Sequence, residues 1–408
     1  MSMRYKGGVI STTSPTVTPP VDGEGGSASG IWSLETQAQY EGDSGWPKPI
    51  LAAELYAWGY NGQGILGLGD TTNRSSPTQV GALITWSKTE VGQFLSVATK
   101  NDGTLWTWGG DPFNYGSLGN NTTTSISSPV QVGALTTWDK IAAGRYGGLA
   151  TTTDGKLYAW GFNNYGQLGQ GNTTNYSSPV QVGALTSWSE LGSGNNHTLA
   201  VKTDGTLWAW GFNNYGQLGQ GNTTSYSSPV QVGSLTNWLK VAGGTYFSAA
   251  IKTDGTLWTW GVNSNGGLGL NISDAINRSS PVQVGALTTW QDMALGQRHM
   301  IATTTDGKLY AWGYNGFGQL GNNTTTNYSS PIQVGALTTW SKVGAGTYFS
   351  MAVKTDGTLW AWGKNAIGQL GQGNTTNRSS PVQVGALTTW SRATSSDTST
   401  SVLAITKS

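Results

Sequence analysis

Carboxylates recur at a fixed place in the sequence and are the first candidates for chemistry. Within residues 51–408 an aspartate stands directly before a glycine six times, at Asp102, Asp154, Asp204, Asp254, Asp306 and Asp356. A ring of such carboxylates could supply general acids and bases. However, Asp-Gly is also the strongest short signal for a β-hairpin. We therefore interpret each aspartate as a turn residue at a position that requires tolerance of a positive φ.

Other reactive residue types are rare. The two histidines, His197 and His299, have no partner at the spacing of a metal site or a catalytic triad, so we expect packing or hydrogen-bonding roles for both. Cysteine is absent, which excludes disulfides, thiolate metal sites and cysteine nucleophiles. No glycine-rich segment has the Gly-Lys-Ser/Thr of a phosphate-binding loop. The sequence predicts a non-enzymatic protein without catalytic residues, metal or cofactor.

An internal repeat explains the regular spacing. The dipeptide Trp-Gly begins at Trp58, Trp108, Trp160, Trp210, Trp260, Trp312 and Trp362, with neighbouring copies 50 or 52 residues apart. A second tryptophan keeps the same register, at Trp86, Trp138, Trp188, Trp238, Trp290, Trp340 and Trp390. Both two-residue insertions fall between Trp-Gly and the next Ser-Ser-Pro, where loops absorb them. The chain therefore contains seven copies of one structural unit.

Each copy has the signals of about four short strands. The segment around Asp154-Gly155 alternates apolar and polar residues about a tight turn, and Pro179 opens another short alternating run. No helical periodicity is present. Units of about 50 residues with four strands are the size of propeller blades. We predict an all-β fold, a seven-bladed β-propeller of residues 51–408.

The two ends of the propeller complement each other. The first copy, from residue 51, lacks the strand that precedes Asp-Gly elsewhere, and the segment 402–406 is a strand without a successor. We predict that this C-terminal strand pairs beside residues 54–59 and closes the ring. We expect residues 1–50 to form a separate, extended and mostly irregular arm. Its second part carries apolar residues that need a docking surface and are candidate anchoring residues: Ile31, Trp32, Leu34, Tyr40 and Trp46.

Composition limits the partners. Of the 408 residues only 10% are charged and the net charge is +1, so no basic surface for nucleic acid is expected. No apolar run is long enough for a signal peptide core or a membrane span, so no membrane insertion is expected. Self-association into a homo-oligomer stays open.

The repeats resemble those of the regulator of chromosome condensation family. The matching residues of one copy are Leu157, Trp160, Gly161, Asn163, Gly166, Gln167, Leu168 and Gly169. The resemblance implies a seven-bladed propeller whose first and last segments share a blade. Members that exchange nucleotide on a small GTPase use a projecting wedge, and no insertion here is long enough to build one. The tryptophans of the ultraviolet-B photoreceptor motif are replaced by Arg145, Asn195, Thr245, Gln297 and Thr347.

The N-terminal text is similar to the opening of structural proteins from tailed bacteriophages of aquatic bacteria. It begins M-S-M-R-Y-K-G-G-V-I-S and continues to Ser-Gly-Ile-Trp-Ser-Leu-Glu and a Trp-Pro. This resemblance implies a virion location: the arm binds other virion proteins, and the propeller is a decoration, tail fibre or host-adsorption module facing a host surface protein or glycan. The alternative is a soluble protein-binding regulator or inhibitor, located in the cytoplasm or outside a bacterial cell.

One position just before each Ser-Ser-Pro varies while its neighbours hardly do. It is occupied by Arg74, Ile126, Tyr176, Tyr226, Arg278, Tyr328 and Arg378. Tyrosine and arginine are enriched at binding hot spots, so these residues form a candidate binding ring on one face of the disc. Alternatively, each side chain packs on an adjacent loop. The position two residues before Trp-Gly holds Tyr or Trp, which suggests a partly exposed strand face, suited to cross-strand packing or to sugar binding.

Overall fold

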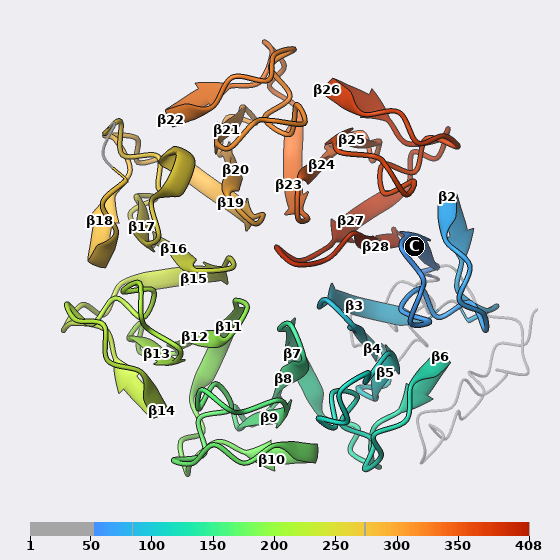
Figure 1. The fold of residues 1–408 in the computed structure, drawn as a ribbon, viewed down its shortest axis with the longest axis vertical. Helices are drawn as coiled ribbons and strands as arrows, with labels where there is room; N and C mark the ends of the chain where they lie inside the picture. Colours follow the sequence, from blue (N-terminus) through green and yellow to red (C-terminus); the bar gives the residue numbers. More distant parts are fainter. Residues whose placement is uncertain (1–52, 84, 273–274, 408) are drawn as a thin grey trace, which may run out of the picture. The chain divides into compact units, whose positions relative to one another are not determined.

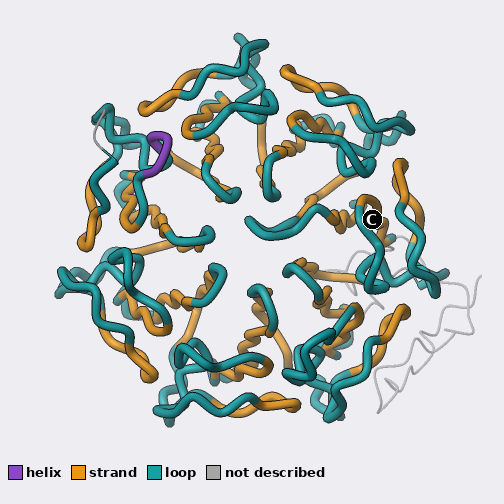
Figure 2. The backbone as a smooth tube through the Cα atoms, in the orientation of Figure 1, coloured by secondary structure: helices purple, strands orange, loops and turns teal. Residues whose placement is uncertain are grey.

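The computed structural model describes residues 53–83, 85–272 and 275–407 of the chain. Within these ranges, 28 strands form seven antiparallel four-stranded sheets around a central axis, as Figure 1 and Figure 2 show. One short 3₁₀ helix, η1 (Ser264–Gly266), is the single helical element that they contain. The predicted seven-bladed, all-β propeller is confirmed.

We number the sheets as blades 1 to 7 along the chain and give their strands from the axis outward. Blade 2 consists of β3 (Trp86–Val91), β4 (Leu95–Lys100), β5 (Leu105–Gly109) and β6 (Ile126–Gln131). Blade 3 consists of β7 (Trp138–Ala143), β8 (Gly147–Thr152), β9 (Leu157–Gly161) and β10 (Tyr176–Gln181). Blade 4 consists of β11 (Trp188–Ser193), β12 (His197–Lys202), β13 (Leu207–Gly211) and β14 (Tyr226–Gln231). Blade 5 consists of β15 (Trp238–Gly243), β16 (Phe247–Lys252), β17 (Leu257–Gly261) and β18 (Arg278–Gln283). Blade 6 consists of β19 (Trp290–Leu295), β20 (His299–Thr304), β21 (Leu309–Gly313) and β22 (Tyr328–Gln333). Blade 7 consists of β23 (Trp340–Ala345), β24 (Phe349–Lys354), β25 (Leu359–Gly363) and β26 (Arg378–Gln383).

Blade 1 combines both ends of the propeller. From the axis outward it consists of β27 (Trp390–Thr394), β28 (Ser401–Thr406), β1 (Leu55–Gly59) and β2 (Arg74–Gln79). The C-terminal β28 pairs with β1 in antiparallel register from Leu55 opposite Ile405 to Gly59 opposite Ser401. The predicted ring closure is therefore confirmed, and backbone hydrogen bonds join the two ends of the propeller.

The antiparallel order gives the disc two different faces. The loop between the first and second strands of a blade and the loop between its third and fourth strands leave from the same face, which we call the upper face. The Asp-Gly hairpins and the links between blades lie on the opposite, lower face. Consequently, all loops that differ between copies in length or in aromatic content project from one side.

Neighbouring blades are held together by the tryptophan of each Trp-Gly. Its indole Nε1 donates to a backbone carbonyl in the upper loop of the preceding blade, at 2.8 to 3.1 Å in all seven blades. Trp210, for example, donates to the carbonyl of Gln167, which also accepts from the Thr198 hydroxyl. A Cβ on Gly169 would lie 2.8 Å from that indole nitrogen, so the loop requires glycine there. Trp58 makes the same bond to Gln369 across the closing seam.

The apolar core lies between adjacent sheets. In one cluster, Leu199 and Leu207 of blade 4 pack with Val241 and Trp260 of blade 5. The Tyr or Trp two residues before Trp-Gly is half-buried in every blade and packs edge-to-face on the tryptophan that begins the innermost strand, as Trp258 does on Trp238 at 6.1 Å. The expected partly exposed strand face is present, and cross-strand packing occupies it.

Removing residues 400–408 should destabilise the whole propeller. The truncation deletes β28, whose residues Val402, Leu403 and Ile405 are at most 5% exposed, and each such side chain contributes about 1.5–3 kcal/mol. We expect a clearly lower Tm by differential scanning calorimetry for this variant and an almost unchanged Tm when only residues 407 and 408 are removed. Equal Tm values for the longer truncation and the full chain would contradict the closure.

Candidate functional site

The loops between the third and fourth strands are rigidly organised by one buried side chain. In blade 3, Asn163 Oδ1 accepts from Leu168 N at 2.9 Å, and its Nδ2 donates to the carbonyls of Asn172 and Thr174. The side-chain oxygen of Gln167 accepts a further hydrogen bond from Tyr165 N. Such loops present their outer side chains in fixed positions, which lowers the entropy lost when a partner binds.

Blade 2 builds the same loop with a carboxylate. Asp111 accepts from the backbone N–H groups of Tyr115 and Gly116 and from the Ser117 hydroxyl, in the place of Asn163. The two extra residues of this copy are therefore Pro112 and Phe113, and they project from the upper face.

The upper face carries a continuous chain of aromatic rings across blades 2 to 5, which we call the aromatic arc. Among the described residues it comprises Phe94, Phe113, Tyr115, Tyr146, Phe162, Tyr165, Phe212, Tyr215 and Tyr246. Each ring lies 4.6 to 6.2 Å, centroid to centroid, from its neighbours in the chain. Such edge-to-face and stacked contacts fix the rings relative to one another.

The arc combines buried and exposed rings. Phe162 is 9% exposed and supports its neighbours, whereas Phe113, Tyr165 and Tyr215 are 51%, 43% and 38% exposed. Contiguous exposed aromatic surface on a folded protein is unfavourable in water and commonly marks a binding surface. The arc is therefore the candidate functional site.

Charge is scarce around the arc. In the described upper loops of blades 2 to 5, Arg145 is the one charged side chain that is not buried; its Nε donates to Gln93 Oε1 at 2.5 Å, and its guanidinium lies 4.7 Å from the Tyr146 ring centre. The exposed polar groups beside the rings are amides, contributed by Asn114, Asn164 and Asn214. The surface is neutral, with both hydrogen-bond donors and acceptors.

A second, smaller group of rings lies on blades 6 and 7. Tyr314, Phe317 and Tyr348 are 5.2 to 6.3 Å apart. The Lys364 ammonium lies 5.0 Å from the Phe317 ring centre, a cation–π distance. This group therefore differs from the arc by an added positive charge.

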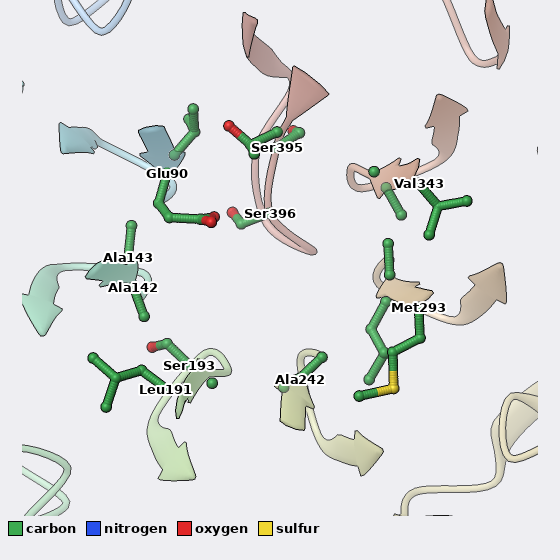
Figure 3. A pocket seen from close by; sticks show the side chains of 18 of the residues that line it. Glu90, Ala142, Ala143, Leu191, Ser193, Ala242, Met293, Val343, Ser395 and Ser396 are labelled. Carbon is green, nitrogen blue, oxygen red and sulfur yellow. The ribbon is translucent and has the colours of Figure 1, made fainter. Parts of the chain in front are cut away.

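The innermost strands enclose a central cavity of about 380 Å³. Its wall combines small apolar residues, including Ala142, Ala242 and Val343, with charged and hydroxyl side chains. In Figure 3 Glu90 and Ser396, which come from neighbouring blades, point toward one another at one side of the cavity. The third residue of each innermost strand is charged at Lys88, Lys140, Glu190, Lys240, Asp292, Lys342 and Arg392. Opposite charges pair across neighbouring blades, as Lys140 does with Glu190 at 3.0 Å. These partly exposed pairs contribute little to stability.

The closing blade breaks the symmetry of the ring. In six blades three residues join the first strand to the second, whereas six residues, 395–400, join β27 to β28. Figure 1 shows this longer loop reaching toward the axis. Asp397 Oδ2 accepts from the Thr245 hydroxyl of blade 5 at 2.7 Å, and the Ser399 carbonyl accepts from Thr347 N and Oγ1 of blade 7. The loop thus crosses the upper mouth of the cavity.

Burial changes the titration of this loop. Asp397 is 3% exposed, and desolvation raises the pKa of its carboxyl to about 7, while the bond from Thr245 and the charge of Arg145 oppose the rise. Desolvation also raises the pKa of Glu90, against the attraction of Arg392.

The variable positions of the candidate binding ring lie elsewhere. Each is the first residue of the outermost strand of its blade, and not a loop residue as expected. The seven residues lie at the rim of the disc, directly after the upper loops: Arg74, Ile126, Tyr176, Tyr226, Arg278, Tyr328 and Arg378. All seven are half-buried. Tyr176 packs against the core between blades 3 and 4, and its hydroxyl accepts from Asn172 at 3.1 Å. The structure therefore packs the three tyrosines and Ile126 on the cores between blades, and the role of the seven positions in binding stays a prediction.

The aspartates of Asp-Gly act as turn residues. Asp204 Oδ1 accepts from Thr206 N and Oγ1 at 3.0 and 2.6 Å, and these bonds hold the pKa of Asp204 below its usual value. The residue with the positive φ is the following glycine, Gly205 in this blade. A Cβ at this glycine would also collide with the Thr236 carbonyl. Our expectation that the aspartate needs the positive φ was wrong in this detail.

Both histidines are buried and hydrogen-bonded across a blade interface. His197 Nε2 lies 2.9 Å from Ser248 Oγ. Because that hydroxyl donates to the carbonyl of Gln217, His197 is the donor. His299 makes the same bond to Ser350. Burial lowers the pKa of His197 to about 3 and of His299 to about 4, so both are neutral at pH 7.

The remaining predicted residues lie outside the described part of the chain. These are the anchoring residues Ile31, Trp32, Leu34, Tyr40 and Trp46 of the N-terminal arm. Within the described ranges, no three His, Asp or Glu side chains are grouped as they would be to hold a metal ion. No helix in those ranges is both long and apolar enough to cross a bilayer.

Comparison with known proteins places the chain in a family. The sequence profile of the "RCC1-like domain" matches residues 190–408, more than half of the chain, and that of the "Regulator of chromosome condensation (RCC1) repeat" matches residues 53–99, 102–150 and 154–201. The chain belongs to the RCC1-like domain family. The resemblance of the repeats is thereby confirmed.

Relatives of this RCC1-like propeller differ in what they do. The chain is 32% identical over 115 residues to the human E3 ubiquitin-protein ligase HERC2. It is 35% identical over 120 residues to the mitochondrial RCC1 domain-containing protein RUG3 of Arabidopsis thaliana. It is 33% identical over 128 residues to the ultraviolet-B receptor UVR8 of that plant. These alignments cover 26–28% of the chain, and only 2% of HERC2, 26% of RUG3 and 27% of UVR8.

Solved structures share the fold of this RCC1-like propeller at low sequence identity. Prp20p from Saccharomyces cerevisiae, described with binding to Gsp1p and histones, superposes with a TM-score of 0.76 at 20% identity, covering 88% of this chain and 92% of its own. Human WBSCR16 gives the same TM-score and identity, covering 88% and 99%. The likeness establishes the propeller and leaves the ligand open.

The aromatic arc was missed by sequence reasoning, although its signal is present. Three positions per copy vary between aromatic and other residues: the third residue of the first upper loop, the residue after Trp-Gly, and the residue before Gly-Gln-Leu-Gly. In blade 3 these are Tyr146, Phe162 and Tyr165. The latter two lie inside the most strongly repeated text, which conceals their variation in the other blades.

Stability should depend on pH through Asp397. Its pKa is about 7 in the fold and about 3.9 in an unfolded chain, so folding favours the protonated carboxyl. The stability of the fold therefore falls as the pH rises toward 7, and above pH 7 the contribution of this protonated group is fully lost. We expect the Tm to increase from pH 8.5 to pH 6.5, and less so in Asp397→Asn. Below about pH 6.5 the buried histidines act in the opposite direction. Equal slopes for the two proteins in calorimetry would refute this assignment.

Replacing Tyr176, Tyr226 and Tyr328 together by Ser separates packing from binding at the rim. Because each ring is half-buried on an interblade core, we expect a loss of about 1 kcal/mol per site and a lower Tm. An unchanged Tm together with lost partner binding would instead make the rim the binding surface.

Proposed function

We propose that this RCC1-like propeller is a non-catalytic binding protein that uses the aromatic arc to hold its partner. The observation that carries the proposal is the unbroken chain of rings on one face, with Phe113, Tyr165 and Tyr215 exposed on rigid loops. Exposed aromatic side chains in fixed positions supply large contact area at low entropic cost.

The titratable groups support a non-catalytic role. The histidines donate hydrogen bonds inside blade interfaces, and the Asp-Gly aspartates accept hydrogen bonds in turns. Asp397 is held by Thr245 in the loop over the cavity. Each is engaged in holding the fold.

We further propose that the protein is a virion component. Residues 1–50 attach it to other virion proteins, and the propeller is displayed for host adsorption, as a decoration or a tail fibre. This part rests on the opening sequence M-S-M-R-Y-K-G-G and the apolar arm residues.

A second candidate function is a soluble regulator that binds another protein. It is supported by one structural neighbour, the yeast protein Prp20p (yeast RCC1), which is described with binding to Gsp1p and histones and as bound to Kap60. In this case too, the arc is the surface available on the upper face.

Mass spectrometry of purified phage particles tests the location. We expect peptides of this chain in particles that have been banded on a density gradient and washed in high salt. Recovery only from the soluble lysate, with the major capsid protein as the positive control, would favour the regulator.

The arc is tested by the triple variant Phe113→Ser, Tyr165→Ser, Tyr215→Ser of the full chain. We expect fluorescently labelled wild type to adsorb to cells of the bacterium on which the particles grow, and the variant to adsorb at least tenfold less with a Tm close to wild type. The matched control replaces three exposed leucines of the lower face, Leu185, Leu235 and Leu287, by Ser. Retained adsorption of the arc variant would end the proposal.

A further inference from the structure

We infer that the ligand of the aromatic arc is an uncharged polysaccharide chain. The inference rests on the proposed function, because it assigns a chemical class to the ligand of that same surface. It follows from three properties of the arc: its ring faces, its lack of charge and its length.

The rings offer surfaces on which flat apolar groups can stack. Tyr165 lies 5.0 Å from Phe212, and Tyr215 lies 5.0 Å from Tyr246, so exposed rings alternate with supporting ones. A pyranose ring presents C–H bonds on its faces and hydroxyls around its edge. Such a ring fits an aromatic surface that has polar groups beside it.

The absence of charge argues against polyanions. Proteins that bind single-stranded nucleic acid combine stacking rings with a row of cations that neutralises the phosphates. In the described upper loops of blades 2 to 5, the single cation is Arg145, which is half-buried and engaged with Gln93 and Tyr146. The arc therefore has the stacking part of such a groove without its electrostatic part.

The amides beside the rings match hydroxyl groups. Asn114, Asn164 and Asn214 are exposed on consecutive blades, each next to an arc tyrosine in sequence. An amide side chain both donates and accepts, and so does a hydroxyl. A proline-rich peptide also docks on aromatic surfaces. Its carbonyls can accept hydrogen bonds from these amides, but its prolines have no N–H to donate to the amide oxygens.

The arc is extended. Its rings continue without a break through the upper loops of four consecutive blades, from Phe94 in blade 2 to Tyr246 in blade 5. Hot spots for globular partners cluster at the centre of a compact patch. A row of rings along an arc instead suits a linear polymer that places successive units on successive blades.

The experiment treats host cells before adsorption of the full-length chain. Periodate cleaves the vicinal diols of sugars, whereas protease removes surface proteins. We expect periodate to reduce adsorption at least tenfold and protease to leave it unchanged. We also expect the neutral polysaccharide fraction of these cells to retard the wild type in a native gel, and the arc variant to require at least tenfold more polysaccharide for the same retardation, with the leucine control behaving as wild type.

Different failures have different meanings. Adsorption that resists periodate but is lost after protease, or complete competition by a polyproline peptide, would overturn the polysaccharide while the arc remains a binding surface. No retardation of the wild type by the neutral fraction would also overturn it. Arc variants that adsorb to untreated cells like the wild type would overturn the proposed function itself.

Discussion

The hydrogen bond from the Trp-Gly indole to the loop of the preceding blade is the contact on which the rest of the structure depends. It recurs at all seven interfaces, including the seam where Trp58 reaches Gln369. The bond is buried, so breaking it leaves an unsatisfied donor in an apolar core. Because the acceptor lies in the upper loop, the same contact that joins two blades also fixes the loop that carries an exposed aromatic residue. Scaffold and candidate site are therefore one system.

The distribution of charge separates the two faces. Lysines pair with carboxylates along the inner strands, as Lys140 does with Glu190, and in the lower hairpins, as Lys202 does with Asp204. The upper loops of blades 2 to 5 are made polar by amides and hydroxyls. A surface of this kind can bind a neutral ligand without removing water from an unpaired charge, which is a large cost at interfaces.

The closing blade is where sevenfold symmetry ends. Its six-residue loop reaches Thr347 of the neighbouring blade 7 and, beyond it, Thr245 of blade 5, so Asp397 is buried in a position that no other copy has. The longer loop is tolerated because the first-to-second-strand connection faces the axis, where there is room for it. One consequence is an upper mouth of the cavity that is covered from one side, next to the loops that bear the arc.

The sequence by itself determined the blade count and the strand pairs, because the repeat period and the Asp-Gly turns are local features of the chain. It also determined the ring closure, because the strand that the first copy lacks is present at the C-terminus. It did not determine the site. Phe162 and Tyr165 lie in repeated text, and only the stacking of blades shows that they meet Tyr115 and Phe212 from neighbouring copies. Likewise, the sequence left open whether Tyr176 is available for binding or packs on its neighbours, and in the fold it packs on a core. Contacts between blades join residues about 50 positions apart, and such distances are set by tertiary packing.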